Sequence, residues 1–533
     1  MKNLLILSVS FSMVACSAPT QTNPDDPTRL GDLQHQFSIS EAAQPYFDQG
    51  LLLLHSFEYD DARAQFKKAV AADPNEVMAH WGLAMTYYKA LWGLQDVEAG
   101  RQVMAVLGED ESARLAKAEN QLEKDFWKGV ELLYGDGELK ERNQAYVDHM
   151  EQVYAANPKN FEVAAFYSLG LMWAGYDKQA YLKKSSAVAA GIVKENPTHP
   201  GALHYMIHAN DNPEFAEVAL NAADEYAKVA PDAAHALHMP SHIYVALGKW
   251  NEVVSSNDAS YQASLKRMQT KGLSGRARGY HSMAWLHYGY LQQGNVEKAT
   301  ALLEEMIGYH QESTSDLSYL IMMQNQQRIE AGVWPEHLEL QKISTTGKRM
   351  SLQSKAQMHF VTSLLAYDQE DAETIQSQVS SLATILEAAK LLVNDEGISL
   401  CSAGPTRYAP NKEGIEKTQV VIHQMEALAA MLKGNSEAVE RHLKVATTIE
   451  AAAVYDSGPP FIAYPSFEQY GDWLLGVQRY EDALDQFNLA LENRTKRTRA
   501  LKGKIAALRA LDREQEAKET ELLLVNPKEG EVS

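Results

Sequence analysis

GLLLLHSFEYDDARAQFKKAVAADP, residues 50–74, is the stretch of sequence that predicts the fold. Its apolar side chains recur at the spacing of an α-helix and do not alternate as in a β-strand. Gly50 stands where a small residue lets two helices approach closely, and Ala62 and Ala69 suit close contacts on a second helix. Pro74 follows at a position where a helix cannot continue. The stretch therefore predicts two helices that are joined by a tight turn and pack together.

The same pattern returns along the chain with a period near 34 residues. Pro197 and Pro231, each at the end of an expected helix, are 34 residues apart. MAWLHYGYLQQGNVEKA (residues 283–299) and YGDWLLGVQRYEDALDQFNLAL (residues 470–491) repeat the small and aromatic residues in the same frame. Self-similarity of this kind is typical of stacked helix-turn-helix units.

These units resemble the tetratricopeptide repeat (TPR). Over nearly its whole length the chain resembles a family of bacterial TPR lipoproteins of unassigned function. The motifs that carry the resemblance are AHWGLAM (79–85), HPGALHYMIHANDNP (199–213), HALHMPSHIYVALGKW (235–250), YHSMAWLHYGYLQQG (280–294) and GPPFIAYPSFEQYGDWLL (458–475). The resemblance implies an all-α, right-handed superhelix, or α-solenoid, over residues 41–533, with about nine to twelve helix pairs. It also implies that the first helix of each pair lines a concave groove.

The beginning of the chain predicts export and a lipid anchor. Residues 1–15 combine a positive charge with an apolar run too short to span a bilayer, as in a signal peptide. Residues 13–16 (MVAC) resemble a bacterial lipobox, which implies cleavage before Cys16 and acylation of that cysteine. The residue after Cys16 is Ser17 and not an acidic residue, so we expect an outer-membrane lipoprotein that faces the periplasm. Residues 16–40 are polar and rich in proline, which predicts a flexible tether.

Composition excludes several classes of protein. A hydrophobic content of 45% excludes global disorder. The net charge of −21 argues against a nucleic-acid partner, because it offers nothing to neutralise a phosphate backbone. The sequence contains no HExxH motif, phosphate loop or dinucleotide fingerprint. Only one other cysteine, Cys401, is present, and its role stays open.

Histidines cluster in the central part of the chain, residues 199–294. Six of the 17 histidines fall within residues 199–244. In the repeat frame, one first helix has two histidines and one aspartate at inward positions, and the next first helix has three histidines there. The next well-matched first helix adds one more histidine. These residues are His204, His208 and Asp211, then His235, His238 and His242, then His281. His199 lies before its helix and is not part of the set. Because first helices of adjacent repeats lie side by side, we expect these side chains to converge.

The histidine set predicts a metal site, with two alternatives left open. Pairs such as His204 and His208 are four residues apart, which places two imidazoles on one helix face as metal ligands require. Asp211 could be a ligand, a general base or the group that orients a ligand. Imidazole and carboxylate suit a divalent transition metal such as Zn, Cu, Ni or Fe. The alternatives are a metal-free site for a peptide or other ligand, and histidines with a purely structural role.

Pro240 falls inside the helix expected around residues 235–244, where it predicts a kink. Further candidates for the lining of the groove come from the same frame. They are Trp81, Met85, Tyr288, Glu468 and Asp472. A basic cluster follows near the end of the array and predicts a solvated helix start. It comprises Arg494, Lys496, Arg497 and Arg499.

The sequence therefore predicts a cell-envelope binding or scaffold protein. Its expected partners are a peptide or protein in the groove and the membrane, through Cys16. The alternative is a metal-dependent enzyme in which the groove histidines are the ligands.

Overall fold

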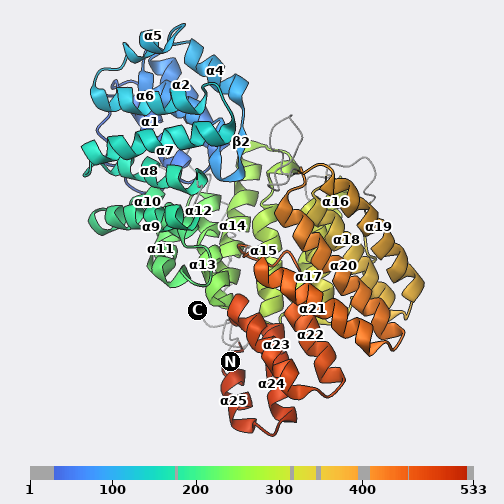
Figure 1. The fold of residues 1–533 in the computed structure, drawn as a ribbon. Helices are drawn as coiled ribbons and strands as arrows, with labels where there is room; N and C mark the ends of the chain where they lie inside the picture. Colours follow the sequence, from blue (N-terminus) through green and yellow to red (C-terminus); the bar gives the residue numbers. More distant parts are fainter. Residues whose placement is uncertain are drawn as a thin grey trace, which may run out of the picture.

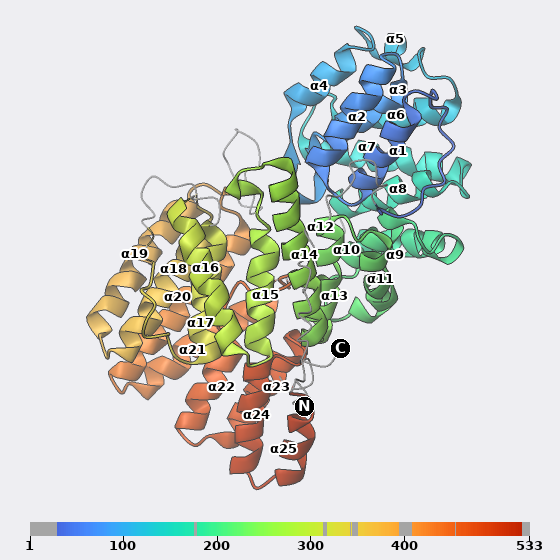
Figure 2. The same cartoon turned by 180° about the vertical axis from the view of Figure 1, so that it is seen from behind.

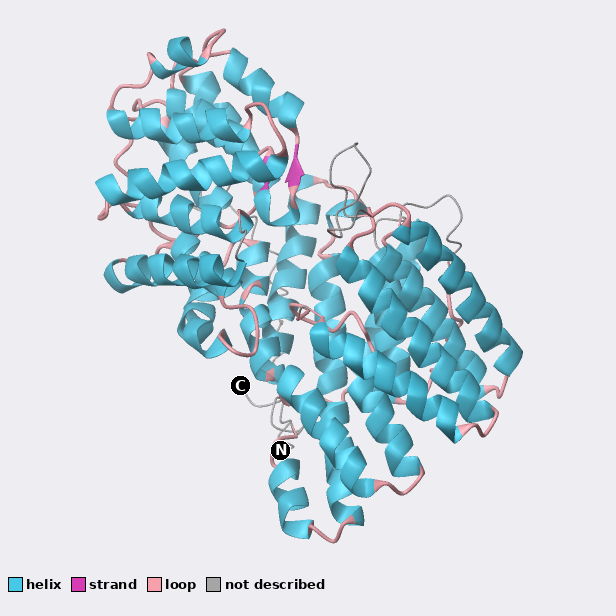
Figure 3. Ribbon diagram, in the orientation of Figure 1, coloured by secondary structure: helices cyan, strands magenta, loops and turns pink. Residues whose placement is uncertain are grey.

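The computed structural model describes residues 29–174, 178–312, 317–341, 343, 350–393, 408–453 and 455–524. Cys401, Cys16, the expected signal peptide and the first part of the expected tether lie outside these residues. Within them the chain is almost entirely helical, and the only strands form one two-stranded antiparallel hairpin (Figure 3). None of the described helices combines the length and apolarity that a membrane span requires.

The elements of the first half of the chain contain the hairpin and most of the short helices. They are α1 (Gln44–His55), α2 (Tyr59–Ala72), α3 (Val77–Met85), β1 (Tyr88–Lys89), η1 (Ala90–Trp92), β2 (Leu94–Gln95), α4 (Val97–Ala105), α5 (Glu111–Leu115), α6 (Gln121–Leu133), α7 (Leu139–Ala156), α8 (Phe161–Trp173), α9 (Lys178–Glu195), α10 (Pro200–Ala209), α11 (Ala216–Val229), α12 (Ala234–His238), α13 (Pro240–Leu247) and α14 (Trp250–Lys271).

The second half is more regular. Its elements are η2 (Gly275–Ala277), α15 (Tyr280–Gln292), α16 (Val296–Glu312), α17 (Leu317–Ala331), α18 (Leu352–Asp368), α19 (Ala372–Lys390), α20 (Lys412–Leu432), α21 (Ser436–Ala452), α22 (Ser466–Gly476), α23 (Tyr480–Asn493), α24 (Thr498–Ala510) and α25 (Glu514–Glu521).

Consecutive helices pack as pairs, and the pairs stack along a solenoid (Figure 1). Within the described residues ten pairs are clear. They are α1–α2, α6–α7, α8–α9, α10–α11, α12/α13–α14, α15–α16, α18–α19, α20–α21, α22–α23 and α24–α25. The all-α, TPR-like array predicted from the sequence is thus confirmed. Both views show an N-terminal lobe and a C-terminal lobe, with α12 to α15 between them (Figures 1 and 2).

Glycine and phenylalanine set the close packing of the repeats at both ends of the array. The ring of Phe66 on α2 lies between Gly50 on α1 and Gly82 on α3, and a Cβ at Gly82 would lie 2.2 Å from it. Phe487 on α23 lies in the same way between Gly471 and Gly503, where a Cβ would lie 2.2 Å away. Only glycine leaves room for a ring at these contacts. The small residues that predicted the fold therefore mark real helix crossings.

The N-terminal lobe has a continuous core instead of an open groove. Helices α1, α3, α8 and α10 contact one another across the axis of the superhelix. Aromatic rings fill the space between them, with Trp81 against Phe126 and Phe166 at ring centroid distances of 5.3 and 5.0 Å. Trp81 is 1% exposed and Met85 is 3% exposed. The prediction that both residues line the groove is wrong, because the first helices converge here and bury their inner faces.

The expected tether is ordered over its second part. Residues 29–40 run without regular secondary structure across the N-terminal helices and bury Leu30 and Phe37. The Ser38 amide donates a hydrogen bond to Glu123 Oε1 at 2.8 Å, and the Arg29 amide donates one to Asp232 Oδ2 at 2.7 Å. The prediction of flexibility therefore fails for residues 29–40, where two apolar side chains among polar ones anchor the segment.

Candidate metal centre

The six predicted histidines meet where α10, α12, α13 and α15 come together. α10 carries His204 and His208, α12 carries His235 and His238, α13 carries His242, and α15 carries His281. Asp211 follows the end of α10. Their ring nitrogens form two groups of three, within each of which the candidate ligand atoms lie within 4.8 Å of one another. We call His204, His208 and His235 the first triad, and His238, His242 and His281 the second triad.

Pro240 interrupts the helical segment that carries His235, His238 and His242. Met239 keeps helical dihedral angles (φ −53°, ψ −38°) between α12 and α13, so the backbone continues through the break. Proline provides no amide hydrogen at this point, which accounts for the interruption. The helix is thus interrupted where the kink is predicted, and His235 and His238 lie on α12.

In the first triad, one nitrogen is fixed by the backbone. His204 Nδ1 lies 2.6 Å from the carbonyl oxygen of His55, which can only accept, so Nδ1 carries the proton. His204 Nε2 therefore has a free lone pair, and it lies 3.2 Å from His235 Nε2. The Nε2 atom of His208 is buried and has no hydrogen bond.

In the second triad, two rings are fixed in the same tautomer. His238 Nδ1 donates to Asn257 Oδ1 at 2.7 Å, while Asn257 Nδ2 donates to the Val253 carbonyl and so sets the orientation of the amide. His242 Nδ1 donates to Asp211 Oδ2 at 2.6 Å. The two Nε2 atoms, of His238 and His242, then face each other at 3.1 Å.

Asp211 orients a histidine in this arrangement. Its carboxylate accepts the Nδ1 hydrogen of His242 and so directs His242 Nε2 toward His238. Burial favours the protonated acid, but His242 outweighs it and lowers the pKa of Asp211, so the carboxylate stays ionised. A carboxylate behind an imidazole is a common supporting group for metal ligands. Of the three roles left open by the sequence, the geometry favours orientation.

Five of the six imidazoles of the centre are held neutral. Burial, reinforced by neighbouring histidines, lowers the pKa of His204, His235 and His238 well below the usual value. The same causes lower the pKa of His208 to about 3. The surrounding protein also lowers the pKa of His281, although this side chain is exposed to solvent. Neutral imidazoles keep the lone pairs that a metal ion needs.

A cavity of about 1360 Å³ opens beside both triads. Its wall includes His208 and His235 of the first triad and His242 and His281 of the second. Asp211 also lines it, together with aromatic side chains such as Trp92 and Tyr455. An ion bound at either triad would therefore have a coordination position accessible from this cavity.

Sequence reasoning missed a third polar cluster, which lies behind the first triad. His55, Glu162 and His199 are completely buried, with Glu162 Oε2 2.8 Å from His55 Nε2 and Glu162 Oε1 3.3 Å from His199 Nε2. His199 Nδ1 accepts from the Ala202 amide at 3.2 Å, and His55 Nδ1 pairs with the Tyr205 hydroxyl at 2.9 Å. We call these three residues the closed cluster. Its residues come from α1, α8 and the start of α10, and no local pattern connects them.

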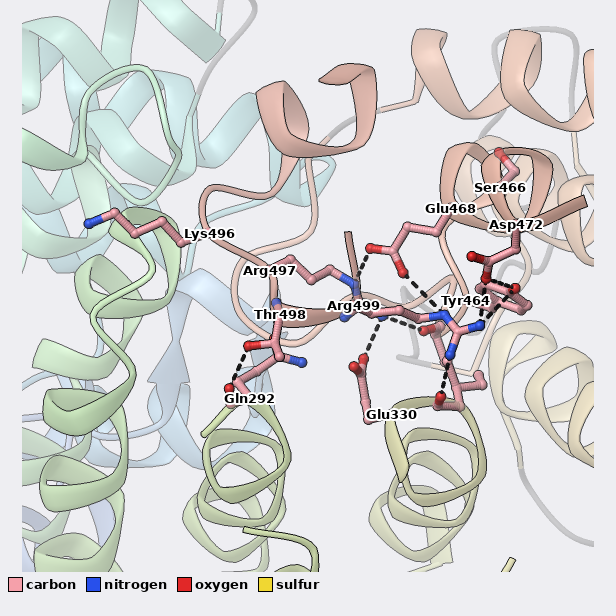
Figure 4. Close-up of polar contacts among 12 residues, drawn as sticks. Gln292, Glu330, Tyr464, Ser466, Glu468, Asp472, Lys496, Arg497, Thr498 and Arg499 are labelled. Carbon is pink, nitrogen blue, oxygen red and sulfur yellow. Dashed lines mark hydrogen bonds and ion pairs between the residues drawn. The ribbon is translucent and has the colours of Figure 1, made fainter. Parts of the chain in front are cut away.

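The remaining groove candidates belong to an ionic network (Figure 4). Glu468 is fully buried and pairs with the buried guanidinium of Arg497, which also pairs with Glu330. Burial and the neighbouring Glu330 raise the pKa of Glu468 against the pull of Arg497. Tyr288 is 1% exposed, and its hydroxyl accepts from Arg497 at 2.8 Å. Glu468 and Tyr288 are thus interior residues, contrary to their expected place in the groove.

Three residues of the basic cluster are paired inside the protein, contrary to the expected solvated helix start, whereas Lys496 is exposed. Arg497 is 0% exposed, and Arg499 pairs with Asp472 and the Tyr464 hydroxyl (Figure 4). Arg494 donates to the carbonyl oxygens of Asp456 and Gly458 at 2.9 Å each. The segment joins the end of the array to α15, because the Thr498 amide donates to Gln292 Oε1 at 2.9 Å. Distant carboxylates and carbonyl groups, which the local sequence does not contain, satisfy these cations.

Asp472 is the one of the five groove candidates that borders an open space. A second cavity of about 560 Å³ lies between α17, α18, α20 and α22. Its lining combines apolar side chains such as Leu364, Leu428 and Trp473 with the paired charges of Asp472 and Arg499. The C-terminal lobe thus keeps an open inner face.

Comparison with known proteins yields only distant structural likeness. No protein-family profile and no curated protein matches the chain. Among solved structures, the TPR domain of P58(IPK) is 12% identical, with 89% of this chain and 99% of that chain covered and a TM-score of 0.22. The Naa15/Naa10 complex bound to HypK-THB is 11% identical, with 91% of this chain and 89% of that chain covered and a TM-score of 0.24. The human IFIT1 dimer with PPP-AAAA is 14% identical, with 92% of this chain and 95% of that chain covered and a TM-score of 0.33. At such values these likenesses carry no argument about the site.

Proposed function

We propose that the protein binds transition-metal ions at the histidine centre and presents them to a ligand in the adjoining cavity. The TPR-like solenoid acts as the scaffold that brings histidines from three successive repeats together. Neutral imidazoles suit Zn, Cu, Ni or Fe, and no thiolate is present among the described residues to favour a structural zinc site.

One contact carries this proposal, the approach of His238 Nε2 to His242 Nε2 at 3.1 Å. Both rings donate through Nδ1, so in the neutral state two lone pairs face each other with no proton between them. Two imidazoles bound to one tetrahedral ion at about 2.0–2.1 Å have their nitrogens about 3.3 Å apart. A metal ion therefore relieves the repulsion at close to the observed separation. A proton shared by the two rings is the alternative that the experiment must exclude.

Elemental analysis tests the proposal. It uses untagged protein that is exported natively. We expect stoichiometric metal in the wild-type chain and reduced metal in His238→Ala and His242→Ala. His423→Ala removes a histidine outside the centre and is the matched control, with unchanged metal. Metal-free wild-type protein that remains folded and takes up no Zn²⁺ after dialysis would refute the proposal and favour the shared proton.

A metal-dependent enzyme is the second candidate, and the cavity favours it. Four of the six histidines lie on the cavity wall, so a bound ion would keep a position open to a substrate. Such an ion would supply Lewis acidity, while Asp211 would keep His242 in its metal-binding tautomer. The test is turnover of a panel of ester and peptide substrates by the metal-loaded chain. Activity that persists after chelation, or in His242→Ala, would count against a role for the ion.

A peptide or protein partner is proposed for the inner face of the C-terminal lobe. The cavity of about 560 Å³ has apolar walls and a charged pair, Asp472 and Arg499, at one side. Binding of a random peptide array to the full chain should weaken in Trp473→Ala, a wall residue that is partly exposed. Equal binding by both proteins would place the partner elsewhere.

We also propose that the protein is a lipoprotein of the outer membrane, anchored at Cys16 and facing the periplasm. The support is the signal-like residues 1–15 and the lipobox-like residues 13–16. Mass spectrometry of the N-terminal peptide should find an acylated cysteine. A chain that partitions into the aqueous phase of a detergent extraction would contradict the anchor.

A further inference from the structure

The histidine centre offers more ligands than one tetrahedral ion can take. Such an ion holds four ligands, whereas six imidazoles meet here. Their candidate ligand atoms fall into two separate groups of three. Each triad by itself is compact, since its ligand atoms lie within 4.8 Å of one another before any ion draws them together.

We propose that the centre is dinuclear, with one transition-metal ion in the first triad and a second ion in the second triad. The inference rests on the proposed function and adds the number of ions and their arrangement. The open positions of both ions face the same cavity, so one oxygen-donor ligand, such as water or a carboxylate, can contact both.

Each triad is built on its own aromatic ring. The ring of Phe57 lies 4.3 Å from that of His204, 5.8 Å from that of His208 and 5.7 Å from that of His235, between centroids. Phe57 adopts a left-handed backbone conformation (φ 55°), which is costly for a bulky residue. The turn between α1 and α2 thus holds a strained residue whose ring contacts all three imidazoles of the first triad.

Trp285 on α15 has the same relation to the second triad. Its ring lies 4.8 Å from that of His238, 4.5 Å from that of His242 and 5.3 Å from that of His281. Trp285 is itself fixed from behind, because a Cβ at Gly458 would lie 2.1 Å from its ring. Two aromatic residues from separate parts of the chain therefore support two separate sets of three imidazoles.

Lone pairs are available in both triads independently. In the first, the carbonyl of His55 holds the proton of His204 on Nδ1, and His208 Nε2 is buried without a hydrogen bond. In the second, Asn257 and Asp211 hold the protons of His238 and His242 on Nδ1. Removal of one ligand from either triad therefore leaves the ligand set of the other intact.

The experiment uses the full, untagged chain stripped with a chelator and reloaded with Zn²⁺ or Cu²⁺. His235→Ala disables the first triad and His281→Ala the second, and both side chains are partly exposed, so the core is preserved. We expect two ions in wild type, one in each single variant and none in the double variant. With Cu²⁺, electron paramagnetic resonance should give the spectrum of an interacting pair in wild type and of an isolated ion in each single variant.

His423→Ala is the control for loss of a histidine outside the centre and should retain two ions. Circular dichroism and the thermal midpoint establish that each variant is folded. One ion per wild-type chain, or loss of both ions from a single folded variant, would overturn the dinuclear assignment and leave the proposed function standing. No ion in the wild-type chain would refute the proposed function itself.

Discussion

Helix α10 lies between two histidine clusters that differ in kind. At its start, His199 belongs to the closed cluster, where the Glu162 carboxylate lies 2.8 Å from His55 Nε2 and 3.3 Å from His199 Nε2 and every ring nitrogen has a polar neighbour. Further along the same helix, His204 and His208 belong to the histidine centre, where imidazoles meet one another and no carboxylate lies between them.

The difference shows that proximity of histidines is not itself the mark of a metal site. In the closed cluster a carboxylate lies between the two imidazoles and the residues are 0% exposed, so an ion has no route to it. In the centre, Nδ1 atoms donate to the protein and the opposite Nε2 lone pairs are left facing one another beside a cavity. Imidazoles that face a carboxylate fit a structural role, whereas imidazole lone pairs that face one another beside a cavity fit the proposed cation site.

The largest expected effect comes from breaking the closed cluster with Glu162→Gln. The side-chain amide of the variant points its own N–H donor at one of the two imidazole N–H groups. Burial keeps water from reaching these unpaired donors. We expect a loss of about 3 kcal/mol in the free energy of unfolding of the metal-free chain at pH 7. Denaturant titration measures it. Glu151→Gln, at an exposed pair with Lys184, should change stability by less than about 1 kcal/mol. Metal content per folded chain should remain that of wild type.

Acid should remove the difference between wild type and Glu162→Gln. Burial alone would raise the pKa of Glu162, but His55 and His199 outweigh it and hold the pKa well below the usual value. A carboxyl with a depressed folded-state pKa contributes stability above its unfolded pKa, and this contribution is lost as the pH falls toward the folded value. The two unfolding curves should therefore converge below about pH 4, by about 1.4 kcal/mol for each pH unit. A constant difference from pH 7 to pH 3 would show that Glu162 is not ionised in the folded chain.

Metal should stabilise the wild-type chain more than it stabilises variants of the histidine centre. At a free Zn²⁺ concentration 100 times the dissociation constant, each bound ion adds about 2.7 kcal/mol to the free energy of unfolding. Thermal denaturation with and without Zn²⁺ measures the gain. His242→Gln should lose the gain of the second triad, and the metal-free variant should be no less stable than wild type, because the facing lone pairs are gone. Equal stabilisation of both proteins would mean that Zn²⁺ acts elsewhere.

Asp211→Asn should weaken the affinity for metal by about 10- to 100-fold without loss of the fold, because the amide orients His242 less strongly and makes it less basic. Competition with a chromophoric chelator gives the dissociation constant. Asp232→Asn is the matched control, since Asp232 is an exposed partner of Arg29 and lies away from the centre. Unchanged affinity in Asp211→Asn would remove Asp211 from the site.

The smallest effect is expected at a third pair of histidines. His423 Nδ1 and His442 Nδ1 lie 3.1 Å apart on α20 and α21, but no hydrogen bond in the described structure fixes the tautomer of His423. One ring can therefore donate to the other. We expect His423→Ala to change stability by less than about 0.5 kcal/mol and the metal content not at all. Loss of an ion from this variant would mean that a short distance between two histidines is enough to identify a metal site. The distinction between the closed cluster and the histidine centre would then fail.

Much of the centre could be predicted because it follows from helix geometry. His204 and His208, and His238 and His242, share faces because they are four residues apart, and the repeat frame places those faces on neighbouring first helices. The interruption at Pro240 is local chemistry of the same kind. The division into two triads was beyond prediction, since Phe57, which contacts the first triad, comes from the distant turn between α1 and α2, although Trp285 lies on α15 beside His281.

By itself, the sequence determined the helices, their pairing in a TPR-like frame and the inward direction of the six histidines, because these depend on spacings within one or two repeats. Only the tertiary structure decided which inner faces stay open. It buries Trp81 in the N-terminal lobe, joins Glu162 to His55 and His199, and draws Arg497 into contact with Tyr288, 209 residues away. The physical reason is that small rotations between successive repeats add up along the solenoid. Their sum, which no single repeat encodes, decides where inner faces meet and where a cavity remains.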